Sequence, residues 1–318
     1  MRLGYCCINL TLRARQPPVY TGRSLIKRLF SMPKASACAA HNTQDLLAIL
    51  EWNRSHAIRV FRITSDLFPR LTDPDNGYRI RDLADAGAIR AGLRAVGRYA
   101  AENNMQLSFH PGPFALFGSP RATVNAAGLR EVEAHAQIAE YICEGADLDI
   151  PINVHIGGSY QGDFEGTARR WLKNFARLSQ IARTRLALEN DDRRAGWSIR
   201  KLHHYIYAHA GVPLTIDLHH FLFGHDGYSM EADYRLAKAT WRQRSNQVHY
   251  SESAGRKLVP AHSDYLKHPL PAFVLQDREA HVLLECKAKE LALLRYRRQF
   301  RIRETAPLRD ASLWARSV

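Results

Sequence analysis

The sequence has no long apolar run, and it contains few cysteines. No stretch approaches the roughly 20 consecutive apolar residues that a membrane-spanning helix needs, and the first residues lack the apolar segment of a secretory signal. Five cysteines among 318 residues are an odd number, which favours free thiols in a reducing compartment over a disulfide framework. We therefore expect a cytoplasmic protein that does not contact a membrane.

Acidic residues are in the minority, and the common nucleotide-binding signatures are missing. No G-x-G-x-x-G or Walker A motif follows the first predicted strand, which weakens a nucleotide-binding interpretation. Lys and Arg number 45 against 31 Asp and Glu, which gives a formal net charge of +14. This excess favours a polyanionic partner, with DNA or RNA first. A basic protein without such a partner is the equal alternative at this point.

A repeated unit runs along the chain, in which a short β-rich run precedes a longer helical stretch. We predict strands at residues 3–8, 58–63, 105–110, 152–156, 185–189, 213–217, 247–251 and 282–285. We predict helices at residues 42–55, 82–103, 129–144, 167–182, 198–209, 230–241 and 287–299. Parallel strands need crossover connections, so this alternation predicts a parallel sheet.

Eight strands are the number that closes a barrel, and the chain exceeds the roughly 250 residues that such a fold needs. We therefore predict an α/β protein with a (β/α)8 TIM barrel as its single domain, at residues 1–299. A doubly wound open sheet is the competing fold. Two segments fall outside the alternation: a long first loop at residues 12–41 and a basic C-terminal tail at residues 300–318.

Six consecutive predicted strands carry an imidazole or a carboxylate at or near their last residue. These residues are His110, His155, Glu189, Asp217, His249 and Glu285, and His220 and His262 follow in adjoining loops. The carboxyl ends of barrel strands meet on one rim, where active sites lie. A single histidine at a strand end is more often structural, and the histidines in predicted helices are interpreted as surface residues: His56, His135, His203, His204 and His209.

The set of eight side chains indicates a metal centre. Burying six or more ionisable groups in one basin is costly without partner charges, and metal ions supply those charges. Imidazoles and carboxylates without thiolates suit Mn²⁺, Zn²⁺ or Fe²⁺, and eight ligands exceed one tetrahedral ion, so we expect two or three ions. Clustered ions hydrolyse phosphodiesters well, so a basic metal nuclease is the leading hypothesis. A metal-dependent sugar isomerase or epimerase on the same barrel is the alternative.

Several motifs, taken in order, resemble the UV damage endonucleases of the UvdE type, which are related in fold to endonuclease IV. The motifs are LGYCCINLTL at residues 3–12, Asn53, FRITS at 61–65, HPG at 110–112, HIGG at 155–158, LEND at 188–191, DLHH at 217–220, VHYS at 248–251 and ECKAKE at 285–290. The resemblance covers residues 1–12 and 42–290. It implies incision of duplex DNA immediately 5′ to UV photoproducts.

The resemblance also implies roles for individual residues. It places metal ligands at His110, His155, Glu189, Asp217, His220, His249, His262 and Glu285, with catalytic roles for Glu189, His110, His249 and Glu285. It implies two or three divalent ions, with Mn²⁺ favoured and Zn²⁺, Mg²⁺ or Fe²⁺ as alternatives. The implied partner is double-stranded DNA with UV lesions, no protein partner is implied, and a bacterial protein of this kind would be associated with the nucleoid.

The lesion-contacting positions hold the main departures from the family. Tyr5 and Asn9 occupy positions of lesion-side contacts, but Pro113 and Phe114 stand where the family usually has Gln and an aromatic residue. Phe114 can still stack on a base, whereas Pro113 cannot form the hydrogen bonds of a Gln amide. Gln247 replaces a lysine that the family tends to have near the metals. These departures leave an inactive barrel that binds damaged DNA as a further alternative.

A dense basic run follows the last predicted strand. It consists of Arg295, Arg297, Arg298, Arg301 and Arg303. We predict that this run extends the DNA-binding surface, and a solvated helix face is the alternative.

Overall fold

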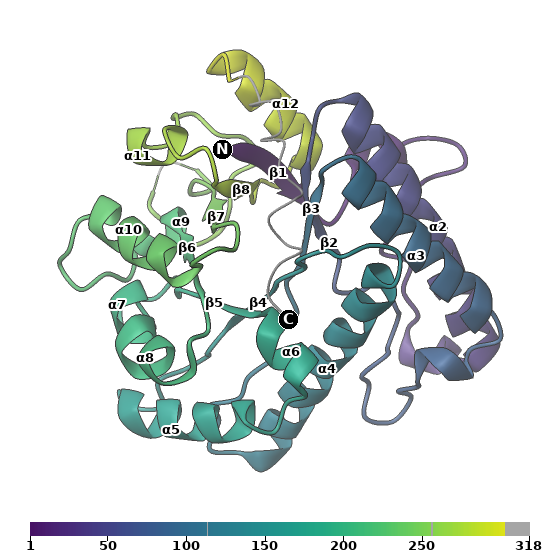
Figure 1. Ribbon diagram of the computed structural model, residues 1–318, viewed down its shortest axis with the longest axis horizontal. Coiled ribbons are helices and arrows are strands. Elements are labelled where there is room, and N and C mark those ends of the chain that lie inside the picture. Colours follow the sequence, from purple (N-terminus) through teal and green to yellow (C-terminus); the bar gives the residue numbers. More distant parts are fainter. Residues whose placement is uncertain (113, 256, 303–318) are drawn as a thin grey trace.

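Eight parallel strands close into a barrel in the computed structural model, which describes residues 1–112, 114–255 and 257–302 (Figure 1). The strands are β1 (Arg2–Cys6), β2 (Val60–Ile63), β3 (Gln106–Phe109), β4 (Ile152–His155), β5 (Leu186–Glu189), β6 (Leu214–Asp217), β7 (Gln247–Tyr250) and β8 (His281–Leu284). Each strand pairs with its neighbours in chain order, and β8 pairs with β1. The predicted TIM barrel is confirmed, and the open-sheet alternative is wrong.

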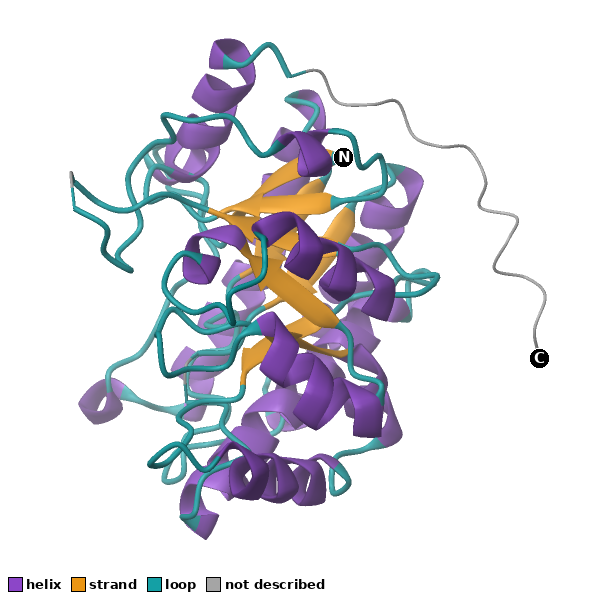
Figure 2. Cartoon of the chain, turned by 90° about the vertical axis from the view of Figure 1, so that its left-hand side faces the viewer, coloured by secondary structure: helices purple, strands orange, loops and turns teal. Residues whose placement is uncertain are grey.

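Helices surround the barrel on the outside, so the strands are buried on both faces (Figure 2). They are α1 (Leu10–Arg13), α2 (Met32–Ser55), α3 (Ala86–Glu102), α4 (Ala122–Cys143), α5 (Phe164–Phe175), α6 (Gln180–Arg185), α7 (Ile199–Leu202), α8 (Ala208–Ala210), α9 (Leu218–Phe221), α10 (Met230–Thr240), α11 (Ala272–Leu275) and α12 (Lys289–Gln299). Burial on both faces explains why strands such as β5 are almost entirely apolar until their last residue.

Short helical turns complete the connections between these elements. They are the 3-10 turns Lys27–Leu29 and Ile80–Asp82 and the π-helical turn His203–Tyr207, which joins α7 to α8. In the described part of the chain, no helix has both the length and the apolar character to cross a membrane. All five cysteines are free thiols, as predicted.

The parallel register places the strand ends level with one another. His155 lies opposite Glu189, and Asp217 lies opposite His249. Gly4 allows β1 to lie close against β2, because a Cβ atom at residue 4 would come within 2.2 Å of the carbonyl oxygen of Val60. The barrel therefore delivers the last residue of several strands to one rim at similar height.

Helix α12 connects the end of the described chain to its beginning. The fully buried carboxylate of Glu290 accepts hydrogen bonds from the backbone N–H groups of Leu10 (2.9 Å) and Thr11 (2.7 Å). On the same helix, the guanidinium group of Arg297 donates to the carbonyl oxygens of His56 (3.0 Å) and Ala57 (2.9 Å). Arg297 thus stabilises the end of α2, which gives it a role inside the fold.

Several predicted boundaries were wrong. Helix α2 begins at Met32, inside the predicted first loop, because Pro33 suits a first helical turn and the following residues are rich in alanine. The predicted helix 167–182 is two helices, since Ser179 caps the start of α6. His135 is buried rather than on the surface, and its Nδ1 atom lies 2.8 Å from the carbonyl oxygen of Glu131.

Most of the predicted basic tail lies outside the described residues, as does Arg303 of the basic run. Of the other four arginines, Arg295 lies over the ring of Tyr265 at 4.8 Å, and Arg298 and Arg301 are exposed.

Candidate metal centre

Glu189, at the end of β5, lies at the centre of the strand-end residues and is almost fully buried. Its Oε2 atom lies 3.0 Å from His110 Nε2 and 3.0 Å from His249 Nδ1. Its Oε1 atom lies 3.4 Å from His220 Nδ1 and 3.9 Å from His155 Nε2. Four imidazoles from four segments therefore surround one carboxylate, as the sequence predicted for this rim.

Glu285 follows β8 and joins the same cluster. Its Oε1 atom lies 3.2 Å from His249 Nδ1 and also contacts the guanidinium group of Arg62 on β2. Its Oε2 atom lies 3.7 Å from His262 Nε2. The ring of His262 is fixed from behind, because its Nδ1 atom lies 2.6 Å from the hydroxyl oxygen of Ser251.

The two carboxylate oxygens of Asp217 differ in their hydrogen bonding. Its Oδ1 atom accepts the backbone N–H groups of His219 (2.7 Å) and His220 (2.8 Å), so the carboxylate caps the start of α9. Its Oδ2 atom is buried and has no hydrogen-bond partner among the described residues. Asp217 and His220 lie in the cluster, whereas His219 Nε2 is turned to the carbonyl oxygen of Val259 at 3.1 Å.

The two buried carboxylates of the cluster, Glu189 and Glu285, are stabilised in their ionised form by nearby positive charge. Burial opposes ionisation of Glu189, but His249 and His155 hold its pKa well below the usual range. Burial likewise opposes ionisation of Glu285, and the charges of Arg62 and His249 overcome it and lower its pKa. Protons on imidazoles provide the positive charge in the absence of other cations.

The pKa values of His220 and His110 shift in opposite directions within the cluster. Burial lowers the pKa of His220, but the neighbouring charges of Asp217 and Glu189 outweigh it and raise the pKa to about 9. Burial lowers the pKa of His110, and its hydrogen bond to Glu189 offsets this only in part. Imidazoles that are drawn toward the same buried anions can hold either protons or divalent ions there.

The donor atoms form two groups that fit divalent ions. His110, His155 and Glu189 form one group, and Glu189, Asp217 and His249 form the other, with the ligand atoms of each group within 4.8 Å of one another. The buried Oδ2 atom of Asp217 supports this fit, because no hydrogen bond reaches it among the described residues and a buried carboxylate oxygen without a hydrogen bond is costly. A nitrogen and oxygen donor set of this kind suits Zn²⁺, Mn²⁺ or Fe²⁺.

A cavity of about 800 Å³ opens over the cluster. Its lining includes Arg62, His262, Gly157 and Gly158. Gly112 also lines it, and Phe114 follows two residues later with 81% of its surface exposed. The cavity is therefore lined by candidate metal ligands, and an exposed aromatic ring lies two residues along the chain from its lining residue Gly112. Pro113 lies outside the described residues.

Tyr5 and Asn9, the two positions that the family resemblance assigns to lesion contacts, lie in the interior of the protein. Both are fully buried: the Tyr5 hydroxyl donates to Asn53 Oδ1 (2.7 Å) and accepts from Asn9 Nδ2 (2.9 Å). Asn9 also caps α1 by accepting the N–H group of Leu12 at 2.8 Å. These contacts fit a packing role for Tyr5, and the lesion contacts of Tyr5 and Asn9 stay a prediction.

Gln247 lies at the start of β7, two residues before His249, so its side chain shares the inner face of the barrel with that histidine. It is buried, and its Oε1 atom has no hydrogen-bond partner in the described part of the protein. Gln247 therefore lies two residues before the candidate ligand His249 on the same strand, and its nearness to bound metals stays a prediction.

Three further residues contact the predicted ligands and were not predicted individually. Arg62 pairs with Glu285, Asn153 donates through Nδ2 to Glu189, and Asp191 lies 3.3 Å from His155 Nδ1. The strand period was the available signal for Asn153, because it precedes His155 by two residues and so faces the same side. Asp191 is the last residue of the LEND motif, but the motif did not indicate its contact with His155, which depends on a loop.

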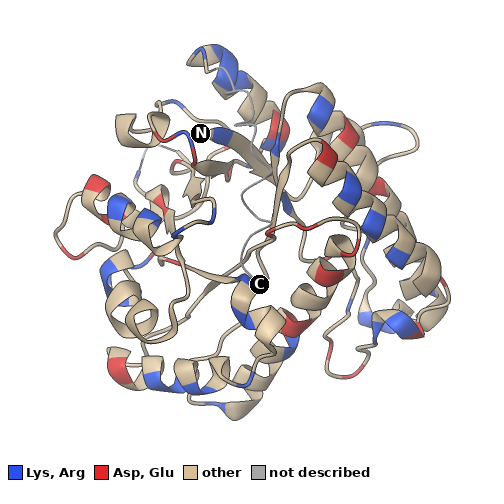
Figure 3. Ribbon diagram, viewed as in Figure 1, with Lys and Arg blue, Asp and Glu red and all other residues tan. Residues whose placement is uncertain are grey.

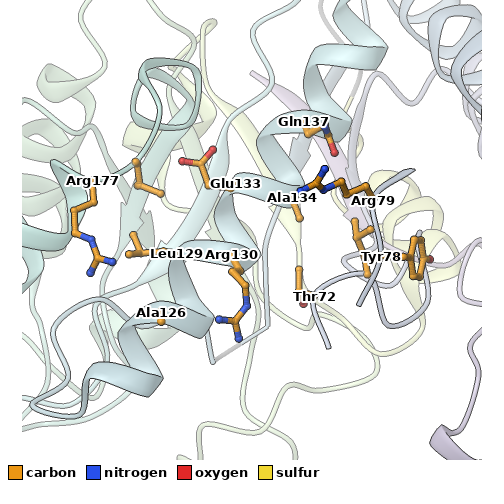
Figure 4. A pocket seen from close by; sticks show the side chains of 12 residues that line it. Thr72, Tyr78, Arg79, Ala126, Leu129, Arg130, Glu133, Ala134, Gln137 and Arg177 are labelled. Carbon is orange, nitrogen blue, oxygen red and sulfur yellow. The ribbon is translucent and has the colours of Figure 1, made fainter. Parts of the chain in front are cut away.

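A second cavity, of about 610 Å³, lies outside the barrel between α4 and the segment that follows β2 (Figure 4). Arg79, Arg130 and Arg177 lie around it, and Glu133 is its acidic residue. Glu133 already accepts two hydrogen bonds from Ser179. This cavity contains none of the predicted ligands, so the chemistry of the strand ends belongs to the first cavity.

Comparison with known proteins identifies the family of this chain. The family model described as UV-endonuclease UvdE matches residues 1–312. The chain belongs to this family. A UV-damage endonuclease of Schizosaccharomyces pombe is 30% identical over 319 residues, which cover 95% of this chain and 51% of the relative. The family resemblance seen in the sequence motifs is therefore confirmed.

Solved structures extend the comparison to three dimensions. The crystal structure of SacUVDE matches with a TM-score of 0.82 at 25% identity, over 95% of this chain and 98% of that chain. Endonuclease IV from Thermus thermophilus matches with a TM-score of 0.59 at 15% identity, again over 95% and 98% of the two chains, and shows a shared fold alone. The chain spans about half the length of the Neurospora crassa and Schizosaccharomyces pombe relatives, 51% of each.

Proposed function

We propose that this protein is a metal-dependent DNA repair endonuclease that hydrolyses the phosphodiester 5′ to UV photoproducts in duplex DNA. The observation that carries the proposal is Glu189, a buried carboxylate shared by two groups of metal ligands on the rim of a UvdE-family barrel. The named relatives are UV-damage endonucleases. A sugar isomerase would have no use for the formal net charge of +14.

Each group of ligands has a definite part in this proposal. His110, His155 and Glu189 would hold one divalent ion, and Glu189, Asp217, His249 and Glu285 would hold another. His220 and His262 lie next to these groups and would serve as ligands of a third. Divalent ions, Mn²⁺ first and Zn²⁺, Mg²⁺ or Fe²⁺ as alternatives, would supply Lewis acidity to the phosphodiester.

The protein's own residues position the reactants. Arg62 contacts Glu285 and holds that carboxylate against His249. Glu189 and Glu285, with low pKa values, stay ionised at neutral pH and keep His110 and His249 oriented toward the same point. These four residues, Glu189, Glu285, His110 and His249, are the catalytic residues that we propose.

The cavity suits a nucleotide that has left the base stack. Its volume of about 800 Å³ falls in the range of ligand pockets, and enzymes that act on damaged bases commonly extrude them. Phe114 is exposed, follows the lining residue Gly112 by two positions, and would stack where the damaged bases leave, which is worth about 1–3 kcal/mol per base. Pro113 precedes it in the chain and belongs to the same proposed contact.

The basic residues suit the phosphate backbone. Figure 3 shows Lys and Arg on many of the outer helices, α12 and α5 among them, with acidic residues interspersed. Arg295, Arg298 and Arg301 are candidates for phosphate contacts, so affinity for DNA should fall as salt rises. Double-stranded DNA with UV lesions is thus the proposed partner, in the cytoplasm or at a bacterial nucleoid, and no protein partner is required.

A plasmid-nicking assay tests the proposal. Supercoiled plasmid, UV-irradiated or not, is incubated with the protein and Mn²⁺, and relaxed circles are counted. We expect nicking of the irradiated plasmid alone and none with Glu189→Gln. The assay is repeated with Zn²⁺, Mg²⁺ and Fe²⁺ in place of Mn²⁺. Equal nicking of both plasmids, or no nicking of either plasmid with any of these four ions, would contradict the proposed function.

Two alternatives have their own outcomes in the same experiment. Damage-selective binding without incision at any metal would indicate the inactive DNA-binding barrel, to which Pro113 and Gln247 point. Turnover of a free sugar without damage-specific nicking would indicate the isomerase or epimerase.

A further inference from the structure

Asp191 lies behind His155, on the side of the imidazole away from Glu189. His155 Nε2 faces Glu189 Oε1 at 3.9 Å, and His155 Nδ1 faces Asp191 Oδ1 at 3.3 Å. The Nδ1 atom is buried, and no formed hydrogen bond reaches it in the described part of the chain. Asp191 is thus the acceptor at ion-pair distance from the ring nitrogen that faces away from the metal site.

A short closed loop fixes the Asp191 carboxylate in this place. The backbone N–H of Asp191 donates to the carbonyl oxygen of Trp197 (2.9 Å), and the backbone N–H of Trp197 donates to Asp191 Oδ2 (3.0 Å). Trp197 is fully buried, so the base of the loop is anchored in the core. The second oxygen, Oδ1, is left facing His155.

Gly196 is required for this packing. A Cβ atom at residue 196 would lie 2.7 Å from Asp191 Cβ and 2.9 Å from Asp191 Oδ2. Within the loop, the N–H of Gly196 also donates to the carbonyl oxygen of Arg193 at 2.8 Å. The loop is therefore built around the Asp191 side chain rather than passing by it.

We propose that Asp191 is a positioning residue that fixes the orientation and tautomer of His155 as a metal ligand. The inference rests on the proposed function, because it assigns a partner to one of the proposed ligands. A neutral imidazole carries one N–H group and one lone pair. With Nδ1–H directed to Asp191, the lone pair of Nε2 faces Glu189 and the metal site, and such partners typically strengthen metal binding.

The variant Asp191→Asn separates this role from a purely structural one. The amide oxygen can keep the hydrogen bond from the N–H of Trp197, which turns the amide NH₂ group toward His155 Nδ1. That nitrogen must then accept a hydrogen bond, so its proton moves to Nε2 and the lone pair is lost from the metal side. The loop is preserved while the tautomer is reversed.

Asp192→Asn is the matched control. Asp192 is the next residue in the same loop, lines the same cavity and carries the same charge, and its nearest ion-pair partner is Arg193 at 3.8 Å. The control therefore removes the same charge from the same loop without changing a contact to a ligand. Asp191→Glu restores a carboxylate behind His155 and serves as the conservative variant.

The experiment titrates full-length metal-free protein with Mn²⁺ by calorimetry and with Co²⁺ by visible absorption. His110→Asn identifies the binding step of the first group, since His110 belongs to that group alone. We expect Asp191→Asn to weaken this step roughly 10- to 100-fold and to change its Co²⁺ spectrum. In Asp191→Asn the second binding step should keep its wild-type affinity. Asp192→Asn should bind both ions as the wild type does, and Asp191→Glu should recover part of the lost affinity. The thermal unfolding of every metal-free variant should match that of the metal-free wild type.

Three other outcomes would contradict either the positioning role of Asp191 or the proposed function itself. If the wild type binds ions and Asp191→Asn binds them equally well with the same spectrum, the positioning role is wrong and the proposed function stands. If Asp191→Asn and Asp192→Asn weaken binding equally, the effect is one of charge and the positioning role is again wrong. If the wild type binds neither ion, the metal-dependent function itself is overturned together with this inference.

Discussion

Glu189 belongs to both groups of candidate metal ligands, and this sharing can be tested through protein stability. A ligand that binds only the folded state stabilises it by about 2.7 kcal/mol when its free concentration is 100 times the dissociation constant. Two independent ions at that level would add about 5 kcal/mol to the free energy of unfolding. Glu189→Gln removes a ligand from both groups, so it should abolish nearly all of this gain.

Two single-group variants give the comparison. His110→Asn changes the first group alone and Asp217→Asn the second alone, so each should lose about 2.7 kcal/mol of the gain. Urea unfolding of each protein is measured with EDTA and with Mn²⁺, and the difference between the two conditions cancels any effect on the metal-free fold. Glu189 is not shared by two ions if Glu189→Gln keeps the metal-dependent stabilisation or loses no more of it than His110→Asn.

Three further predictions follow from particular contacts. Arg297→Met should lower the free energy of unfolding by about 2 kcal/mol, because two charged hydrogen bonds to carbonyl oxygens are lost from a partly buried side chain. The same variant should leave the salt dependence of DNA binding unchanged. The control Arg298→Met should change the free energy of unfolding by less than about 0.5 kcal/mol. Burial and the charge of Arg2 lower the pKa of His281 to about 3, so the unfolded chain takes up a proton first as pH falls below about 6.5. Between pH 7 and pH 5 the wild type should therefore lose about 2 kcal/mol more stability than His281→Gln in urea unfolding, and equal losses would contradict the low pKa. Tyr5→Phe should lower the free energy of unfolding by about 1–3 kcal/mol, because buried polar groups of Asn9 and Asn53 lose their hydrogen-bond partner. Nicking of irradiated plasmid should persist in this variant. Loss of nicking without loss of stability would instead indicate that Tyr5 contacts the lesion.

The strand ends were predictable from the sequence because two independent patterns coincide there. An apolar run buried on both faces ends in a polar residue only where the strand leaves the barrel, as β5 does at Glu189. The closure of eight parallel strands then brings those ends together without any knowledge of loops. His110, His155, Asp217 and His249 followed from the same argument.

Contacts that depend on loop conformation could not be predicted in this way. The position of Asp191 behind His155 requires the loop closed by Trp197 and the absence of a side chain at Gly196. The burial of Tyr5 depends on Asn53, which is distant in sequence and lies on α2. A motif identifies such residues without saying whether they face a substrate or the core.

Local preferences also competed with one another in the helices. The start of α2 at Met32 was obscured because Pro33 reads as a loop residue until its place in the first turn is known. His135 was assigned to the surface by residue type, whereas it packs edge-on against Phe109 with ring centroids 5.3 Å apart. Residue type alone does not decide burial when a backbone carbonyl can satisfy the ring.

The bonds from Glu290 to Leu10 and Thr11 have a consequence for biosynthesis. The first connection of the barrel cannot reach its final form until residue 290 has left the ribosome, because its backbone N–H groups are bonded to that carboxylate. At roughly 5–20 residues per second, translation of the chain to that point takes about 15–60 seconds. During this interval β1 lacks its partner β8, so one edge of the nascent sheet stays unpaired.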